Sequence, residues 1–287
     1  MARTRGALMA TVFVTGVAGF VGSRVTRTLR QRGHHVIGTD IADGLDLRDT
    51  RSVSAAIGAG APDAVVHLGG VSGPMLLADD PAAVVDINCV GTANVLAASH
   101  RAEVPTVVYA ASVAAYADGT SENAGPDSIY AVTKRFGEDL LDYYRRQGRR
   151  RWTSVRVGSV YGSGRVTSNP IMEMIARARG GDPVVVDPRA VEPLVHIDDC
   201  GTLLAGLVEV AEPAACYELV ERVENHRVIA ETVVREALSR STIVLDESAA
   251  APPPYPCAFD VTPLLRDTGQ PTMTSLDEGI RQILETL

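Results

Sequence analysis

The sequence predicts an α/β protein in which a doubly wound parallel sheet carries a small C-terminal α/β cap. Three observations predict this fold class. Short apolar runs alternate with helix-compatible segments through the first 165 residues, a glycine-rich turn directly follows the first run, and the later elements are shorter and richer in proline. Alternating strands and helices form βαβ units, which give a parallel sheet covered on both faces. We therefore expect a Rossmann-like sheet with ligands at the carboxyl ends of its strands.

The first half of the chain supplies the elements of that sheet. Its apolar runs are rich in β-branched residues and are typical of strands buried on both faces. Gly33 is expected to end the first helix. We expect strands at 11–15, 35–39, 64–68, 106–110 and 153–157, and helices from the glycine turn to 32, at 81–100 and around Tyr130.

The second half of the chain changes character, because its elements shorten and its prolines become frequent. We expect helices near 170–179, 199–210, 225–239 and 275–287, and short strands at 184–186, 217–219 and 243–245. Residues 10–165 are therefore predicted to form a dinucleotide-binding domain to which later segments return. Residues 166–287 are predicted to form mainly a substrate-binding cap.

A glycine loop follows the first predicted strand. Gly16, Gly19 and Gly22 are spaced as G-x-x-G-x-x-G, with Phe20 and Val21 before the last glycine. The first glycine permits the tight turn, the second the close approach of a pyrophosphate, and the third close packing of helix on strand. N–H groups of the first helical turn then face the phosphates. A plain tight turn is the alternative, but the strand before the loop and the helix after it favour a dinucleotide.

Asp40 ends the second predicted strand. A carboxylate at this position hydrogen-bonds the ribose hydroxyls of adenosine and repels a 2′-phosphate. No arginine follows at once, because Ile41 and Ala42 come next, so NAD is predicted rather than NADP. The alternative is a turn, since Asp-x-x-Asp-Gly from Asp40 to Gly44 is also turn chemistry.

Tyr130 and Lys134 are four residues apart in a predicted helix, so their side chains share one face. A phenol has a pKa of about 10, and a nearby ammonium lowers it. The pair is therefore a candidate acid/base catalyst for a secondary alcohol. For the pair in isolation, the alternative is an exposed tyrosine beside a solvated lysine.

Further spaced motifs accompany the glycine loop and the Tyr-x-x-x-Lys pair. They are Asp46-Leu47, His67-Leu68-Gly69-Gly70, Asn88-x-x-Gly91-Thr92-x-Asn94, Ser112-x-x-x-Tyr116 and Val195-His196-Ile197-Asp198-Asp199. Together, over residues 11–200, they resemble the extended short-chain dehydrogenase/reductase family of NAD-dependent sugar epimerases and dehydratases. The resemblance implies a Rossmann fold, NAD as cofactor and a sugar-like small molecule as substrate.

The resemblance also implies roles for individual residues. Tyr130 is the acid/base, Lys134 binds the nicotinamide ribose and lowers the pKa of Tyr130, and Ser112 hydrogen-bonds the substrate oxygen. Asn88 supports the catalytic region, whereas His67 is interpreted as a core histidine. Family members often dimerise through the helix of the tyrosine and the helix before it, so we expect a homodimer.

A second group of residues is expected at the cofactor. Asp46 and Leu47 are candidates for contact with the adenine ring. An equally open interpretation of the same loop is that Asp49 caps the next helix, and both can hold. The residues expected to line the rest of the cofactor pocket are Leu68, Gly69, Gly70 and Val157.

The substrate end departs from the nucleotide-sugar members of the resembled family. Those members commonly carry an asparagine where this chain has Ser159, and often a diphosphate-gripping arginine where it has Glu192. Ser72 and Ser159 instead resemble the uronate dehydrogenase branch, in which the matching serines contact a free sugar acid. Arg165 is a candidate partner of a carboxylate or phosphate, and a surface arginine is the alternative.

Composition and charge argue against several other classes. The formal net charge of −8 disfavours nucleic acid and anionic membranes as partners. No window reaches the roughly 18 uninterrupted apolar residues of a membrane span. The four cysteines, Cys89, Cys200, Cys216 and Cys257, show neither a Cys-x-x-Cys pair nor zinc-site spacing, so no metal site is expected. They are typical of a reduced, cytoplasmic protein.

These observations lead to two enzymatic hypotheses. The first is a dehydrogenase that oxidises a secondary alcohol of a free sugar or sugar acid and releases NADH. The second is an epimerase or dehydratase of a nucleotide sugar that keeps NAD bound and recycles it. A non-catalytic NAD-sensing protein is a third hypothesis, against which Ser112, Tyr130 and Lys134 argue.

Overall fold

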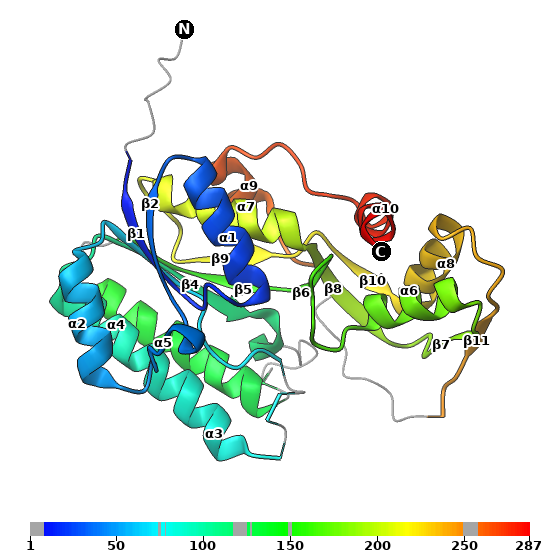
Figure 1. Ribbon diagram of the computed structural model, residues 1–287, viewed down its shortest axis with the longest axis horizontal. Helices are drawn as coiled ribbons and strands as arrows, with labels where there is room; N and C mark the ends of the chain where they lie inside the picture. The colour runs from blue at the N-terminus through cyan, green and yellow to red at the C-terminus, as the bar shows by residue number, and fades with distance from the viewer. Residues whose placement is uncertain are drawn as a thin grey trace, which may run out of the picture.

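The structure is a computed structural model that describes residues 9–73, 76–77, 79–116, 125–126, 128–148, 151–248 and 258–287. Figure 1 shows a larger part, in which helices cover both faces of a sheet, and a smaller part formed by later elements of the chain. Cys257 lies outside the described residues.

The larger part contains a six-stranded parallel sheet in the order β2-β1-β3-β4-β5-β9. Its central strands are apolar because both faces are covered. Val12, Val66 and Val108, for example, are fully buried. The predicted doubly wound parallel sheet is confirmed. Its strands are β1 Thr11–Thr15, β2 His35–Thr39, β3 Ala64–His67, β4 Thr106–Ser112, β5 Arg151–Val157 and β9 Cys216–Leu219.

The sixth strand corrects the interpretation of the second half of the chain. The sequence places the strand at 217–219 among the cap elements, but in the structure β9 pairs in parallel with β5. Helix α7 (Ile197–Gly206) likewise lies on the sheet, packed against α1 (Phe20–Gln31). The reason is burial, since Leu203 of α7 and Leu219 of β9 belong to one core cluster. The chain therefore leaves the sheet for the cap and returns to it.

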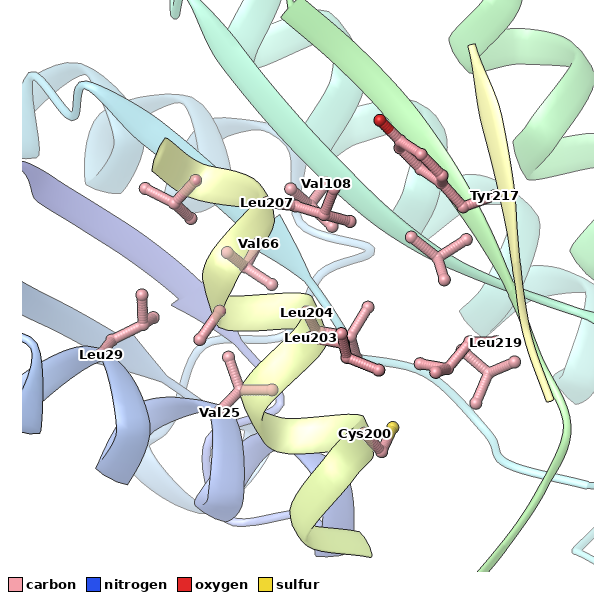
Figure 2. Close-up of a cluster of buried hydrophobic side chains, with 14 of the residues drawn as sticks. Val25, Leu29, Val66, Val108, Cys200, Leu203, Leu204, Leu207, Tyr217 and Leu219 are labelled. Carbon is pink, nitrogen blue, oxygen red and sulfur yellow. The ribbon is translucent and has the colours of Figure 1, made fainter. Parts of the chain in front are cut away.

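Helices cover both faces of the sheet (Figure 1). Figure 2 shows the core on one face, where Val25 and Leu29 of α1 meet Leu203 and Leu204 of α7 above Val66 of β3. A second core on the opposite face is built around large side chains such as Trp152, Tyr109 and Leu141. The helices on the first face are α1, α7 and α9 (Thr262–Thr268), and those on the second are α2 (Thr50–Gly60), α4 (Gly91–Arg101) and α5 (Ile129–Gln147).

The helix expected at 81–100 is interrupted. It begins as α3 (Pro81–Val85), widens into a π-helical turn at Asp86–Val90 and continues as α4. Such π-helical turns are frequent at functional sites, and this one contains the buried Asn88. By length and composition alone the segment Pro81–Arg101 could cross a membrane, but half of its apolar window is buried inside the protein, as in a core helix.

The smaller part has a core of its own. It contains a three-stranded sheet in the order β10-β8-β6 and a two-stranded sheet of β11 and β7. Three helices pack on them and bury Ile175, Ile229 and Ile280 completely. The strands are β6 Ser159–Tyr161, β7 Val184–Val186, β8 Val191–His196, β10 Arg222–Asn225 and β11 Ile243–Leu245, and the helices are α6 Pro170–Gly180, α8 His226–Glu236 and α10 Leu276–Thr286.

Gly137 allows α5 to lie close to β4. A Cβ at this position would stand 2.2 Å from the hydroxyl oxygen of the buried Tyr109. We therefore expect Gly137→Ala to lower the free energy of unfolding by about 1–3 kcal/mol in urea titrations. The matched control is Gly58→Ala in α2, where a Cβ meets nothing within 4 Å and helix propensity adds about 0.5–1 kcal/mol. Equal stability of Gly137→Ala and wild type would contradict this packing.

Candidate active site

A cavity of about 1040 Å³ runs along the carboxyl ends of the parallel strands and continues to elements of the cap. Of the site residues predicted from the sequence, Asn88 does not line it. Those that do are Gly16, Gly19, Phe20, Val21, Gly22, Asp40, Asp46, Leu47, Leu68, Gly69, Gly70, Ser72, Ser112, Tyr130, Lys134, Val157, Ser159, Arg165 and Glu192.

The glycine turn leaves no room for side chains. Gly16 has a φ of +74°, and a Cβ on it would lie 2.8 Å from the nitrogen of Gly69. A Cβ on Gly22 would lie 1.9 Å from the carbonyl oxygen of Gly16. Gly19 is the N-cap of α1 and offers no capping side chain, so N–H groups of the first turn remain available to an anion. These features fit the pyrophosphate of a dinucleotide.

Asp40 makes the turn contact that the sequence left open as an alternative, and it also lines the cavity. Its Oδ1 accepts the N–H of Ala42 at 3.3 Å, which caps the turn after β2. Its Oδ2 accepts the N–H of Ala18 in the glycine loop at 3.0 Å. The carboxylate thereby joins the end of β2 to the glycine loop and lines the cavity, at the place where an adenosine ribose is expected.

Asp46 is held by Arg48, a cavity residue that the sequence analysis missed. The guanidinium donates to both oxygens of Asp46, at 2.6 Å from Nη2 to Oδ2, and also to Asp86 at 3.1 Å. These hydrogen bonds lower the pKa of Asp46. Asp49 caps α2 by accepting two N–H groups. The helix cap by Asp49 is therefore confirmed, whereas contact of Asp46 and Leu47 with the adenine ring stays a prediction for two residues that line the cavity.

The junction of β4 and α5 brings the three predicted catalytic side chains together. Tyr130 hydrogen-bonds to Ser112, and the Nζ of Lys134 lies 5.8 Å from the centroid of the Tyr130 ring. Lys134 is only 9% exposed, in contrast to a solvated lysine, and it donates to the carbonyl of Ala110 at 3.0 Å. The spacing of four residues thus places both side chains on the helix face that packs against β4.

Burial and three neighbouring groups act in opposite directions on the pKa of Tyr130. Burial raises the pKa of Tyr130, and three contacts oppose this shift: the hydrogen bond with Ser112, a main-chain hydrogen bond at Gly73 and the positive charge of Arg165. Burial also lowers the pKa of Lys134 to about 8. Arg165 therefore adds a positive charge at Tyr130 that the sequence did not predict, beside the Lys134 ammonium, which is directed to the Ala110 carbonyl.

Asn88 ties the loop after β3 to α5. Its Oδ1 accepts the N–H of Val71 at 2.8 Å, and its amide donates to the Val71 carbonyl at 3.2 Å. The same amide donates to the hydroxyl of Thr133 at 3.0 Å, and Thr133 donates to the carbonyl of Tyr130 at 2.7 Å. Asn88 therefore links a cavity loop to the catalytic helix without lining the cavity itself.

The carboxylate of Glu192 and the guanidinium of Arg165 both line the substrate end of the cavity. Glu192 on β8 lies 3.3 Å from the Nε2 of His226. Arg165 has no carboxylate partner among the described residues, and its charge acts on both Glu192 and Tyr130. Burial lowers the pKa of Arg165 but leaves it a cation. Its donors reach the main-chain carbonyls of Val160, Thr167 and Ser168.

Asn169 is a further cavity residue that the sequence analysis missed. Its Oδ1 accepts two N–H groups at the start of α6, so its amide group turns the other way, to within 3.5 Å of the Ser159 hydroxyl. Asn169 is 2% exposed. A signal was present, because asparagine followed by Pro170 is typical of a helix start. A cap alone, however, does not indicate a cavity.

Comparison with known proteins places these motifs in a family. A model of the NAD dependent epimerase/dehydratase family matches residues 12–216. Protein CapI of Staphylococcus aureus is 27% identical over 181 residues, 53% of this chain and 54% of that protein. UDP-glucuronate 4-epimerase 1 of Arabidopsis thaliana is 29% identical over 186 residues, 53% of this chain and 42% of that protein. The chain spans about half the length of these curated relatives.

Solved structures match the fold over nearly the whole chain. The UDP-glucose 4-epimerase of Thermus thermophilus in complex with NAD has a TM-score of 0.79 at 23% identity, covering 96% of this chain and 98% of that one. The UDP-glucose 4-epimerase of Thermotoga maritima with UDP-glucose has a TM-score of 0.82 at 18% identity, covering 96% and 97%. Because the family match includes the glycine turn and the Tyr130–Lys134 pair, the chain belongs to the NAD dependent epimerase/dehydratase family, an enzyme family with NAD as cofactor.

Proposed function

We propose that this protein is an NAD-dependent epimerase of a nucleotide sugar whose ring carries a carboxylate. The observation that carries the proposal is that Ser112, Tyr130 and Lys134 line one cavity, which also presents the cation of Arg165. Relatives named UDP-glucuronate 4-epimerase and solved UDP-glucose 4-epimerases support a nucleotide sugar. This reverses the order of the two sequence hypotheses, in which the free-sugar dehydrogenase came first.

In the proposed reaction Tyr130 exchanges a proton with the hydroxyl of the reacting sugar carbon. Ser112 orients that hydroxyl through its own hydrogen bond, and Lys134 holds the catalytic face of α5 against Ala110. NAD supplies the hydride acceptor and donor when it is bound. In an epimerase Tyr130 returns its proton to the ketone oxygen after the sugar has presented its other face. The tyrosine is thus base and then acid in one turnover.

Arg165 supports an acidic sugar as substrate. It forms no ion pair with a carboxylate among the described residues, and its side chain is partly buried. A cation in such a setting favours an anionic ligand. Glucuronyl groups, which the curated relatives act on according to their names, carry that anion.

A second candidate function is retained because of Glu192. This carboxylate, paired with His226, occupies a position at which nucleotide-sugar members of the resembled family often carry a diphosphate-binding arginine, and Ser159 stands where they commonly carry an asparagine. Both replacements favour a substrate without a diphosphate. The second candidate is therefore a dehydrogenase of a free sugar acid, in which Arg165 and Tyr130 keep the same roles.

We also propose a homodimer through α5 and the helix before it. Ile129, Val132, Phe136 and Tyr143 recur at helical spacing on one face of α5 and are 39–52% exposed. Val85 and Val90 are exposed on the neighbouring segment that packs against α5. Exposed apolar side chains gathered on two neighbouring helical segments are typical of a protein interface.

A cytoplasmic location remains a proposal. It is supported by Cys89, Cys200 and Cys216, which are free thiols in the described part of the chain. The acidic net charge of −8 supports the proposal that neither nucleic acid nor an anionic membrane is a partner.

The substrate that the enzyme turns over separates the two candidate functions. With UDP-glucuronate we expect conversion to its 4-epimer without net formation of NADH, and with free glucuronate or galacturonate no NADH. NADH formed with a free uronate, and no turnover of any nucleotide sugar, would establish the second candidate instead. Under either function Arg165→Met should raise KM by about 10-fold or more, whereas the control Arg177→Met on α6 should not.

Removal of the Tyr130 hydroxyl tests its assignment as the acid/base. Tyr130→Phe should lower kcat by about 10²–10⁴-fold because the proton acceptor is removed. Its affinity for NADH, measured by fluorescence titration, should stay close to that of wild type. The control is Tyr143→Phe on the same helix, which is 52% exposed and should keep full activity. An active Tyr130→Phe enzyme would refute the assignment.

A charge introduced on the apolar face of α5 tests the proposed dimer. Val132→Glu places a charge in the proposed interface and should convert the protein to a monomer in light scattering coupled to size-exclusion chromatography. The control is Val228→Glu on α8, an equally exposed helical valine outside the interface, which should leave the mass unchanged. A wild-type monomer, or a dimeric Val132→Glu variant, would contradict this interface.

A further inference from the structure

A buried chain of polar side chains runs beneath the cofactor end of the cavity. The Nδ1 of His67 lies 2.8 Å from the hydroxyl of Thr15, and its Nε2 lies 3.0 Å from the hydroxyl of Thr92. Thr92 hydrogen-bonds in turn to Tyr109, whose ring lies 5.4 Å from the ammonium of Lys134. All of these side chains are at least nine-tenths buried. The chain thus connects the end of β1 with the catalytic helix.

The hydroxyl of Thr15 has two further partners at the rim of the cavity. It accepts the N–H of Leu68 at 3.1 Å and the N–H of Gly69 at 3.0 Å. Both residues line the cavity, and Gly69 is the residue against which Gly16 packs without room for a Cβ. Thr15 therefore determines how the loop after β3 sits beside the glycine turn.

The hydrogen bonds that the Thr15 hydroxyl accepts determine which ring nitrogen of His67 carries the proton. A hydroxyl has two lone pairs and one proton. The two main-chain N–H groups occupy both lone pairs, so the Thr15 proton must be donated to the Nδ1 of His67. Nδ1 then carries no proton, and the ring proton lies on Nε2, which donates to Thr92. The neutral Nε2–H tautomer gives every donor of Thr15 and His67 an acceptor, whereas the other tautomer leaves the Thr15 proton without one.

We propose that His67 is a positioning residue that, as the neutral Nε2–H tautomer, holds Thr15 in the orientation that fixes the cofactor-binding main chain at Leu68 and Gly69. The role is independent of the substrate and of the choice between epimerase and dehydrogenase. Burial, with a smaller contribution from the charge of Lys134, lowers the pKa of His67 to about 3, so the ring stays neutral at physiological pH.

The tautomer can be read directly from the wild-type protein. Long-range proton–nitrogen NMR spectra of ¹⁵N-histidine-labelled protein distinguish a protonated ring nitrogen from an unprotonated one. Among the six histidines, the His67 signals are those absent from a His67→Asn variant. We expect Nε2 protonated and Nδ1 unprotonated, with no change between pH 5 and pH 8. A proton on Nδ1, or a charged ring in this range, would overturn the proposal.

The effect on the cofactor is tested at Thr15, with NADH affinity as the readout. Thr15→Val leaves two partly buried N–H groups without their acceptor and should weaken NADH binding by about 10-fold. Thr15→Ser keeps the hydroxyl and should restore wild-type affinity. The control is Thr106→Val at the opposite end of the sheet, where the buried hydroxyl has no partner among the described residues. Equal NADH affinity of Thr15→Val and Thr106→Val would overturn the positioning role.

Discussion

The packing of helix α5 on strands β4 and β5 is the constraint on which the rest of the candidate active site depends. Tyr130, Lys134 and Glu138 recur every four residues on the inner face of this helix, and each meets the sheet through a different contact. Lys134 reaches the carbonyl of Ala110 at 3.0 Å, and Glu138 accepts two donors from Arg156 of β5. A shift of one residue along the helix would break all of these contacts together, because they share one face.

The same packing also positions the segment that follows β4. Tyr116 donates to Glu138 at 2.7 Å, and the guanidinium of Arg156 lies 3.7 Å from the centroid of its ring. A cation stacked on a ring and paired with a carboxylate gains from both contacts when the group is partly withdrawn from water. The ion pair that positions α5 therefore also anchors the residues directly after Ser112.

The two ends of the cavity use different kinds of recognition. The cofactor end is shaped by main chain, because Gly16, Gly22 and Gly69 approach too closely to admit side chains. The substrate end is shaped by charged side chains on loops and on the cap strands, above all Arg165 and Glu192. Main-chain geometry is shared across a family, whereas side chains at loop and cap positions differ between substrates. This division accounts for a firm family assignment together with two candidate substrates.

Local patterns in the sequence determined a large part of this protein. The strands of the six-stranded sheet, most of the helices and the glycine turn could be predicted because apolar periodicity, glycine spacing and helix caps act over a few residues. The cap strands β6, β8 and β10 were not predicted. The Tyr130–Lys134 pair belongs to the same class, since spacing along one helix fixes a shared face. Chain order and the crossover rule were then enough to bring Gly16, Asp40 and Ser112 to one rim of the sheet.

Only the tertiary structure decided what depends on contacts between distant segments. The sequence predicts that later segments return to the sheet but places the strand at 217–219 in the cap, whereas β9 pairs with β5 after the chain has built much of the cap. Arg165 acts on Tyr130, and Asn169 reaches Ser159, because packing of the cap turns those side chains into the cavity. The physical reason is that periodicity identifies which face of an element is buried, whereas the partner of a polar side chain is set by the three-dimensional packing of the whole chain.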